Sequence, residues 1–286
     1  KTPTIAALAD VVLPAQTFAE RNGIAFVSGA QRGSTINKVT HVGECKSDME
    51  INLELGRRWN PEAWPWDNVD DMFTDMLKPT EMSFEELQKV APAYQPIEYY
   101  RYKTGKLRPD GQPGFNTPTG RIELWSNFYS RAGLDPLPYF EEPEPGPGST
   151  PELMEEYPLV MTSGARFWGM FHSEHRQIER MRHYRPWPLV DIHPDTAAKY
   201  GIKDGDWVWL EGPMGRAKRK AKLTVQMDRR IVSCDHGWWF PEGDPEKFYD
   251  VFELNINNTL PWIPGKSGFG SNYKSSICKI YKVEGE

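Results

Sequence analysis

Residues 206–225 read DWVWLEGPMGRAKRKAKLTV, and this stretch decides the fold that we predict. The runs 206–211 and 216–225 are typical of strands, because the first is rich in Trp, Val and Leu and the second alternates with period two. Gly212-Pro213-Met214-Gly215 separates the two runs and is typical of a hairpin turn. We therefore expect the C-terminal half of the chain to fold around a β-hairpin.

Four further strand-like segments flank this hairpin in the sequence. They are 157–162, 189–193, 231–234 and 276–283. One short helix is expected among them, because Pro194 suits a first helical position and Gly201 suits a left-handed C-terminal cap. Six strands with one or two short helices predict a closed β-barrel over residues 157–286.

The basic residues of the hairpin allow two interpretations. Four of them share one strand face: Arg216, Lys218, Lys220 and Lys222. The other face carries Ala217, Arg219, Ala221 and Leu223. The basic stripe would suit RNA, or it is the solvated outer face of a hairpin. We favour the solvated face, because no aromatic residue is interleaved as a stacking platform.

The region before the barrel divides into two zones. Residues 1–58 alternate strand-like segments, at 9–13 and 24–28, with a helix that Asp48 would cap, which is typical of the end of an α/β sheet. Residues 59–156 are a predicted connecting region. It would hold a helix capped by Asp67, a helix after the capping box Ser83 to Glu86, a strand at 121–126 and a Pro/Gly-rich linker at 143–151.

Composition excludes several classes of protein. The chain of 286 residues has 34 Lys and Arg against 40 Asp and Glu, so its net charge of −6 argues against nucleic acid held by bulk positive charge. No stretch approaches ~18 consecutive apolar residues, so no membrane span is expected. Cys45, Cys234 and Cys278 have no CxxC spacing, which excludes a disulfide scaffold and a Cys-rich zinc or iron–sulfur site within this chain.

The first residues predict a piece of a longer polypeptide. The chain opens at Lys1 without Met or a signal-peptide pattern and continues directly into a strand-like run at 6–13. A chain trimmed at a flexible end is the alternative.

Two segments after the first barrel strand could bind a ligand. The turn Thr162–Arg166 would present backbone N–H groups and a guanidinium to a phosphate. His172 and His175 form an HxxH pattern, but no third zinc ligand is evident. A nucleophile pair of Ser173 and His175 lacks the GxSxG motif. The plain alternative is a surface helix that Ser173 caps.

Later loops add further candidates. Gly237, between His236 and Trp238, would let a backbone approach closely, although three consecutive aromatic residues also suit a core. Asn255, Asn257 and the Gly-rich loop 265–274 offer amide edges to heterocycles, or are ordinary turns. In a barrel these loops could converge at one end, where they would suit a ligand with phosphates and purine-like rings.

Several motifs together carry a family resemblance. They are ADVVLP at 9–14, GECKSD at 43–48, TPTGRIEL at 117–124, the run 157–166, HSEHRQ at 172–177, GIKDGD at 201–206 and HGWWFPE at 236–242. With these motifs the chain resembles the C-terminal third of a molybdopterin oxidoreductase of the dimethyl-sulfoxide-reductase superfamily, in its acetylene-hydratase-like branch. The resemblance covers most of 1–58 and 115–286 and is thin from 59 to 114.

The resemblance implies a mixed α/β protein in three parts. Residues 157–286 would be a six-stranded double-psi β-barrel that binds a molybdopterin guanine dinucleotide, held as the bis-MGD form with Mo or W. Residues 1–58 would be the remnant of a Rossmann-like α/β cofactor-binding domain, and 59–156 would connect them. The implied cofactor-binding residues are Thr162, Ser163, Gly164, Ala165, Arg166, His172, Ser173, His175, Arg176, His236, Gly237, Trp238, Asn255, Asn257, Tyr273 and Lys274.

Two positions depart from the family pattern. His193 precedes Pro194 where the family often has Asn, so the helix cap is expected to differ. The run Asn257-Asn258-Thr259-Leu260 is rearranged, which leaves Asn258 unassigned.

The family's metal ligand and iron–sulfur cysteines come from an earlier part of the polypeptide. The resemblance therefore implies that this chain alone does not catalyse, and no catalytic residue or metal ligand is assigned in it. Its role would be to hold and orient the cofactor and to shape the substrate funnel. The implied partners are the remainder of the same polypeptide and an electron-transfer subunit. The other hypotheses are a stand-alone β-barrel binding module without a redox cofactor, and a hydrolase built on His172 and His175.

Overall fold

The computed structural model describes residues 2–27, 32–94, 98–137, 139–163, 167–170, 172–265 and 276–285. The chain divides into two compact units. The barrel unit comprises Lys1–Ala9 and Leu124–Glu286, and the helical unit comprises Asp10–Glu123.

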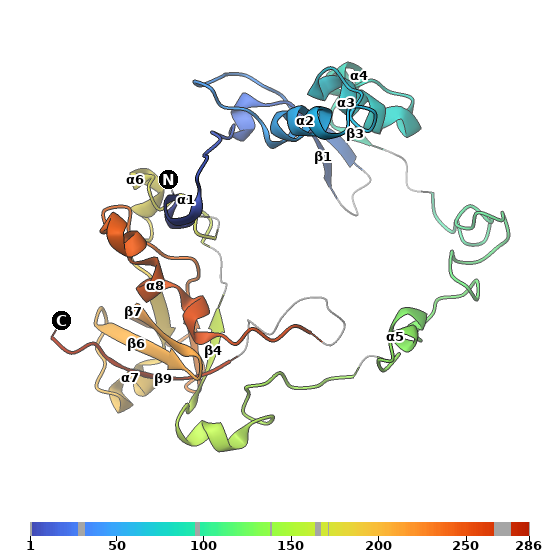
Figure 1. Ribbon diagram of the computed structural model, residues 1–286. Helices are drawn as coiled ribbons and strands as arrows, with labels where there is room; N and C mark the ends of the chain where they lie inside the picture. The colour runs from blue at the N-terminus through green and yellow to red at the C-terminus, as the bar shows by residue number, and fades with distance from the viewer. Residues whose placement is uncertain are drawn as a thin grey trace. The chain divides into compact units, whose positions relative to one another are not determined.

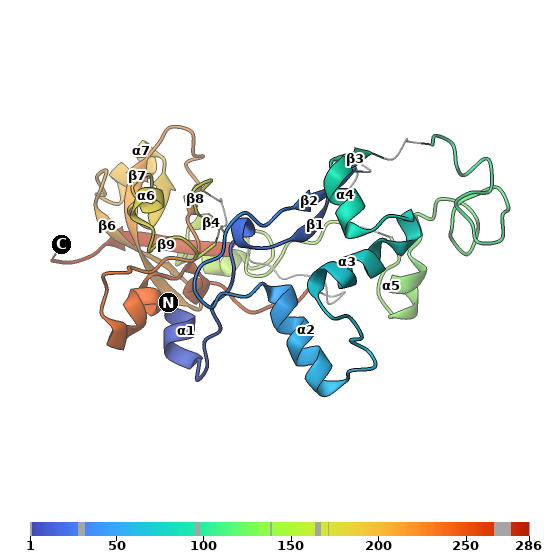
Figure 2. The same ribbon diagram turned by 90° about the horizontal axis from the view of Figure 1, so that it is seen from above.

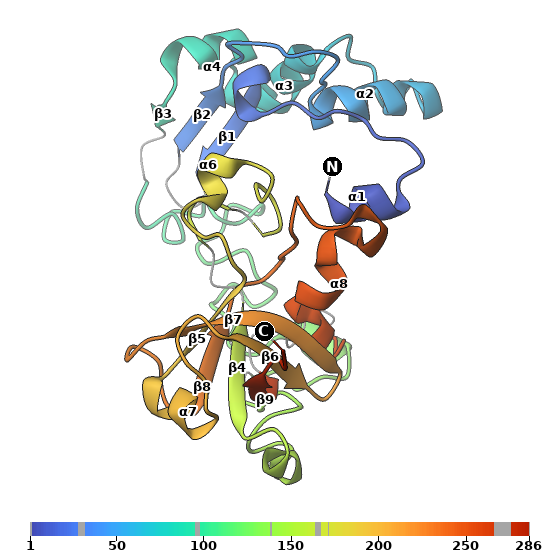
Figure 3. The same cartoon turned by 90° about the vertical axis from the view of Figure 1, so that its left-hand side faces the viewer.

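The barrel unit is built on six strands that close into a barrel in the order β4-β8-β5-β7-β6-β9 (Figure 3). The strands are β4 (Leu159–Ser163), β5 (Leu189–Ile192), β6 (Trp207–Gly212), β7 (Gly215–Leu223), β8 (Ile231–Cys234) and β9 (Ser276–Lys282). The pairs β4–β8 and β5–β7 are parallel, and the other four pairs are antiparallel. The predicted strands are confirmed, with their ends shifted by at most two residues.

One face of each strand fills the barrel. Val208 and Leu210 of β6 are fully buried, as are Val190 and Ile192 of β5. Each such side chain contributes about 1.5–3 kcal/mol when it leaves water. Because the side chains of a strand alternate between its faces, Trp207 and Trp209 lie on the outer face of β6. The predicted turn 212–215 joins β6 to β7 as a hairpin.

The pairing directions bring one end of each of the six strands to the same end of the barrel. Met161 near the end of β4 pairs with Ser276 at the start of β9, and Cys234 at the end of β8 pairs with Val190 near the start of β5. The hairpin turn between β6 and β7 lies at this same end, because Glu211 pairs with Lys279 near the start of β9. We call this end the mouth of the barrel.

Short helices complete the barrel unit (Figure 1). They are α1 (Pro3–Leu8), α5 (Asn127–Arg131), η3 (Pro151–Glu155), α6 (Glu179–Arg182), α7 (Pro194–Lys199), η4 (Pro245–Asp250), α8 (Val251–Leu254) and η5 (Ile256–Thr259). The predicted helix α7 is confirmed, and Gly201 beyond its end has φ +66°. His193 caps α7 through its ring, since Nδ1 accepts a 3.1 Å hydrogen bond from the backbone N–H of Asp195.

The helical unit combines a small antiparallel sheet with helices (Figure 2). Its elements are η1 (Phe18–Glu20), β1 (Gly23–Val27), β2 (Arg32–Ile36), α2 (Asp48–Trp59), α3 (Val69–Leu77), η2 (Lys78–Thr80), α4 (Phe84–Val90) and β3 (Ala93–Tyr94). Its core consists of Met72, Phe73, Leu77, Phe84 and Leu87. The mixed α/β fold class is thereby confirmed.

Helix starts in this unit follow local capping rules. The predicted capping box at Ser83 and Glu86 is confirmed. The other two caps lie one residue from the predicted ones: Ser47 Oγ accepts from the backbone N–H of Glu50, and the Asn68 side chain accepts from that of Asp71. Short polar side chains crowd both helix starts, so sequence alone places each cap only to within a residue.

Two predicted strands are wrong. Residues 9–13 form no strand, and Val11 and Leu13 are 77% and 57% exposed. Residues 121–126 also form no strand, and Ile122 and Leu124 are 68% and 81% exposed. Both runs have an apolar pattern, but no neighbouring strand in the described part of the chain pairs with them. Within the same described residues, no helix has the length and apolar character needed to cross a membrane.

Candidate functional site

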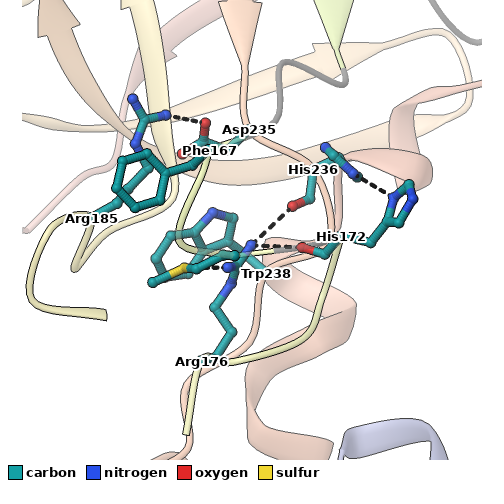
Figure 4. Close-up of a pocket in the computed structure, with 8 residues that line it drawn as sticks. Phe167, His172, Arg176, Arg185, Asp235, His236 and Trp238 are labelled. Atoms are coloured by element: carbon teal, nitrogen blue, oxygen red, sulfur yellow. Dashed lines mark hydrogen bonds and ion pairs between the residues drawn. The ribbon is translucent and has the colours of Figure 1, made fainter. Parts of the chain in front are cut away.

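The candidate site lies at the mouth of the barrel, where the segments that follow β4 and β8 meet (Figure 4). The lining residues are Phe167, Met170, His172, Arg176, Arg185, Asp235, His236 and Trp238. They leave a free space of about 10 Å³. That is room for about one water-sized group, so a phosphate oxygen could enter the pocket but an aromatic ring could not.

Arg176 is the central cation of this pocket and is only 4% exposed. Its Nη2 donates to the carbonyls of His172, at 2.8 Å, and His236, at 3.4 Å, and its Nη1 contacts the sulfur of Met170 (Figure 4). The guanidinium carbon lies 4.3 Å from the ring centroid of Trp238. Desolvation lowers the pKa of Arg176 to about 10, while the charge of Asp235 acts in the opposite direction. Arg176 thus links the segment that follows β4 to the segment that follows β8, and it places a positive charge in the lining of the pocket.

Two histidines meet at the edge of the pocket. His172 Nδ1 and His236 Nε2 lie 2.7 Å apart, with the rings edge to face at 4.9 Å between centroids. One ring must donate and the other accept, and which one donates depends on the tautomers. His172 has φ 50° and His175 has φ 70°, in the left-handed region that costs a non-glycine residue about 1–2 kcal/mol. These backbone conformations require compensating contacts such as those of Arg176.

Gly237 permits the close approach of the two segments. It has φ +64°, and a Cβ on this residue would lie 3.0 Å from both the carbonyl carbon of His172 and the nitrogen of Ser173. The sequence predicts a close backbone approach at Gly237. In the structure the approaching backbone is that of His172 and Ser173. Trp239 Nε1 also donates a 2.7 Å hydrogen bond to the carbonyl of Ser173.

Ion pairs next to the pocket were not predicted from the sequence. Arg185 pairs with the buried Asp235, and Arg182 pairs with Glu242. Asp235 also accepts a 3.2 Å hydrogen bond from the backbone N–H of Leu189. One sequence feature points to Asp235 as a site residue: it directly follows a predicted strand and precedes His236. No nearby sequence feature points to Arg185.

The structure brings together part of the predicted site. His172, Arg176, His236 and Trp238 line one pocket, with Gly237 beneath the His172 backbone. Thr162 and Ser163 end β4 beside Ser233 and Cys234. Five predicted residues lie outside the described part of the chain: Gly164, Ala165, Arg166, Tyr273 and Lys274.

Three other predicted residues lie near the mouth but do not line this pocket. The His175 side chain is 41% exposed and lies 4.0 Å from Glu174. Asn255 accepts a 3.0 Å hydrogen bond from the backbone N–H of Asn257 at the start of η5. The helix η5 packs against the β6–β7 hairpin, where a Cβ on Gly212 would lie 2.8 Å from the carbonyl oxygen of Thr259.

The arrangement gives no support to a hydrolase. Among the described residues no hydrogen bond joins the Ser173 hydroxyl to the His175 ring, and His175 instead faces Glu174. No group of three or more His, Cys, Asp or Glu in these residues could hold a metal ion. The chemistry that remains is binding by buried N–H donors and imidazole edges.

The outer face of the β6–β7 hairpin differs from the sequence expectation. Arg216 lies 4.1 Å over the ring of Trp209, Lys218 lies 5.2 Å over Trp207, and Lys220 lies 4.2 Å over Trp187. No aromatic residue lies within the basic stripe of β7, as the sequence shows, but Trp207 and Trp209 of β6 and Trp187 place aromatic rings beside its cations. Cations of this chain already cover these rings, and Arg216 and Lys222 are the exposed members of the stripe.

Comparison with known proteins identifies the barrel. Residues 159–259 match the family model of the Molydopterin dinucleotide binding domain. The chain is similar to acetylene hydratase of Syntrophotalea acetylenica, with 35% identity over 86% of this chain and 33% of that protein. It is also similar to dopamine dehydroxylase of Eggerthella lenta, with 31% identity over 97% of this chain and 34% of that protein.

A solved structure agrees with these matches. The structure of acetylene hydratase from Pelobacter acetylenicus has a TM-score of 0.85 and 32% identity, and it covers 99% of this chain and 39% of that chain. The present chain spans about a third of the length of the curated relatives that it matches. It belongs to the molybdopterin oxidoreductases, as a C-terminal part that is similar to acetylene hydratase and contains a molybdopterin dinucleotide-binding domain.

Proposed function

We propose that this chain binds and orients a molybdopterin guanine dinucleotide, as part of a molybdenum or tungsten oxidoreductase or hydratase. The observation that carries the proposal is the buried cation Arg176 in a pocket at the barrel mouth, within the matched domain. A dinucleotide cofactor is anionic and needs guanidinium and N–H donors at its phosphates.

The donors of the pocket fit such a ligand. Arg176 Nε and Trp238 Nε1 are buried, and neither has a hydrogen-bond partner among the described residues. A buried donor without an acceptor costs about 1–3 kcal/mol. A phosphate oxygen entering the pocket would offer these donors an acceptor, and the free space of about 10 Å³ has room for one such oxygen.

Several predicted residues receive a specific role in this proposal. Arg176 would donate to a phosphate oxygen, and His172 and His236 would present ring edges to the pterin. Thr162 and Ser163 would begin a phosphate-binding segment, and the proposed set continues in sequence with Gly164, Ala165 and Arg166, which lie outside the described residues. Ser173, His175, Gly237, Trp238, Asn255 and Asn257 complete the described part of the proposed cofactor-binding set. Tyr273 and Lys274 belong to the proposed set but lie outside the described residues.

The reactive metal needs ligands from elsewhere. Cys234 and Cys278 are buried in the barrel core, where burial raises the pKa of Cys234 to about 12 and that of Cys278 well above its ordinary value. Neutral buried thiols are poor metal ligands. When bound, the cofactor's metal would supply two-electron or hydration chemistry. We propose that its protein ligand and an iron–sulfur cluster belong to the remainder of the polypeptide, with an electron-transfer subunit as a further partner, and that this chain alone is inactive.

Calorimetric titration with guanosine diphosphate tests the proposal on the 286-residue chain. We expect saturable binding by the wild-type chain and about tenfold weaker binding by Arg176→Gln, which corresponds to about 1.4 kcal/mol. The matched control is Arg230→Gln, because Arg230 is 82% exposed on its side chain and pairs only with Asp228 among the described residues. The control should bind as tightly as the wild type.

Two results would count against this function. A wild-type chain that binds no guanine nucleotide would favour the alternative, a stand-alone β-barrel module without a redox cofactor. Equal losses in the Arg176 and Arg230 variants would show that only general surface charge is being measured.

A further inference from the structure

Arg219 is a charged residue enclosed in the barrel. It lies on β7 between Ala217 and Ala221, and these two alanines belong to the barrel core. Because alternate residues of a strand share a face, Arg219 points into the barrel, while Arg216, Lys218, Lys220 and Lys222 lie on the other face. Its side chain has no exposed surface. The small alanines on either side leave room for it.

The guanidinium of Arg219 has no acceptor in the described part of the chain. None of Nε, Nη1 and Nη2 has a hydrogen-bond partner there. Burial lowers the pKa of Arg219, and the neighbouring groups that favour its charge are Cys234 and Asp235. Cys234 offers no counter-charge, since its pKa is about 12 and the thiol is neutral at pH 7. An unpaired buried charge is strongly destabilising, so its presence needs an explanation.

The charge balance at the mouth of the barrel is unequal. Three other arginines lie close enough to Arg176 for their charges to lower its pKa: Arg219, Arg185 and Arg182. Glu242 neutralises Arg182, and Asp235 neutralises Arg185. Arg176 and Arg219 have no carboxylate partner among the described residues. Two buried positive charges are therefore left at one site, beside the unpaired donors Arg176 Nε and Trp238 Nε1.

We infer that Arg219 is a buried electrostatic anchor that strengthens the binding of a phosphate or pyrophosphate group in the pocket beside Arg176. The inference rests on the proposed function and adds a residue to it. Arg219 does not line the pocket, so it acts through its charge, whereas Arg176 donates to the ligand directly. The low dielectric between the two groups makes this action effective, since charges interact several-fold more strongly in protein than in water.

This role predicts opposite effects on stability and binding. Arg219→Met replaces the charge by an apolar side chain of similar length, so the ligand-free chain should unfold at a higher temperature than the wild type. The same variant should bind inorganic pyrophosphate and guanosine diphosphate about tenfold more weakly, by calorimetric titration. Arg219→Lys keeps the charge and should stay within about threefold of the wild-type affinity. Arg216→Met, on the outer face of the same strand, should leave affinity for both probes unchanged.

The possible outcomes are distinguishable. If Arg219→Met unfolds at a lower temperature or fails to fold, Arg219 is a structural residue held by the barrel, and the inference is overturned. Unchanged affinity in a folded Arg219→Met chain overturns it as well. If the wild-type chain binds neither probe, the proposed function itself fails. A further result separates the two proposals. If the wild-type chain binds guanosine diphosphate, Arg176→Gln weakens this binding and Arg219→Met does not, the proposed function stands and only the role of Arg219 is removed.

Discussion

At the scale of single residues, the candidate site depends on unusual backbone conformations. His172, His175 and Gly237 all have positive φ, and the first two lack the conformational freedom of glycine. Such residues often occur at binding sites, where surrounding contacts hold them in place. Here the contacts are the hydrogen bonds of Arg176 to the carbonyls of His172 and His236.

Gly237→Ala should destabilise the barrel unit more than Gly201→Ala. Both glycines have positive φ, +64° and +66°, so both variants carry the same left-handed cost of about 1–2 kcal/mol. Only Gly237 has backbone atoms 3.0 Å from the added Cβ, whereas Gly201 has nothing within 4 Å. Urea unfolding at pH 7 should show Gly237→Ala to be less stable than Gly201→Ala by about 1–3 kcal/mol. Equal losses of unfolding free energy in the two variants would show that the close approach of residues 172–176 to Gly237 adds no cost to the alanine substitution.

At the scale of elements, the helix α7 shows how a departure from the family pattern is accommodated. His193 replaces the commoner cap, and its ring nitrogen accepts from the N–H of Asp195. Pro194 then starts the helix and Gly201 follows its end, as their residue types predict. Local chemistry of this kind is readable from sequence because the interacting residues are two to four positions apart.

His193→Ala should lower the free energy of unfolding by about 1 kcal/mol, the usual value of a helix N-cap. His193→Asn should restore the loss, since Asn offers an acceptor at the same place. The two variants can be compared by urea unfolding, with the exposed His183→Ala as control. A His193→Asn chain as unstable as His193→Ala would contradict the capping role.

At the scale of the whole barrel, strand β9 closes the fold by pairing with both β4 and β6. An ionic cluster covers the outside of this closure. Tyr281 donates a 2.5 Å hydrogen bond to Glu211, and Lys279 lies 3.1 Å from Glu211 and 3.0 Å from Glu156. The hydrogen bond from Tyr281 and the charge of Lys279 lower the pKa of Glu211 from its ordinary value of 4.5.

The barrel should therefore lose stability in acid through Glu211. A carboxyl whose pKa is lowered in the folded state contributes stability above its ordinary pKa and loses it as the pH falls through the folded value. Between pH 7 and pH 3, the wild-type chain should lose more free energy of unfolding than Glu211→Gln, which cannot ionise. Glu62→Gln, at an exposed position, should follow the wild type. Equal losses of unfolding free energy in all three chains would show that Glu211 does not contribute to the loss of stability in acid.

Periodicity and turn chemistry in the sequence determined the strands, the hairpin, the helix α7 and the loops that carry the site. These features depend on residues close together in the chain, so their pattern is visible there. Only the tertiary structure decided that Arg219 is enclosed without a described acceptor, that Asp235 pairs with Arg185, and that Trp207 and Trp209 lie under the cations of β7. It also decided that the runs 9–13 and 121–126 form no strands. The physical reason is that strand pairing and barrel closure set the neighbours of a side chain, and those neighbours come from distant parts of the chain.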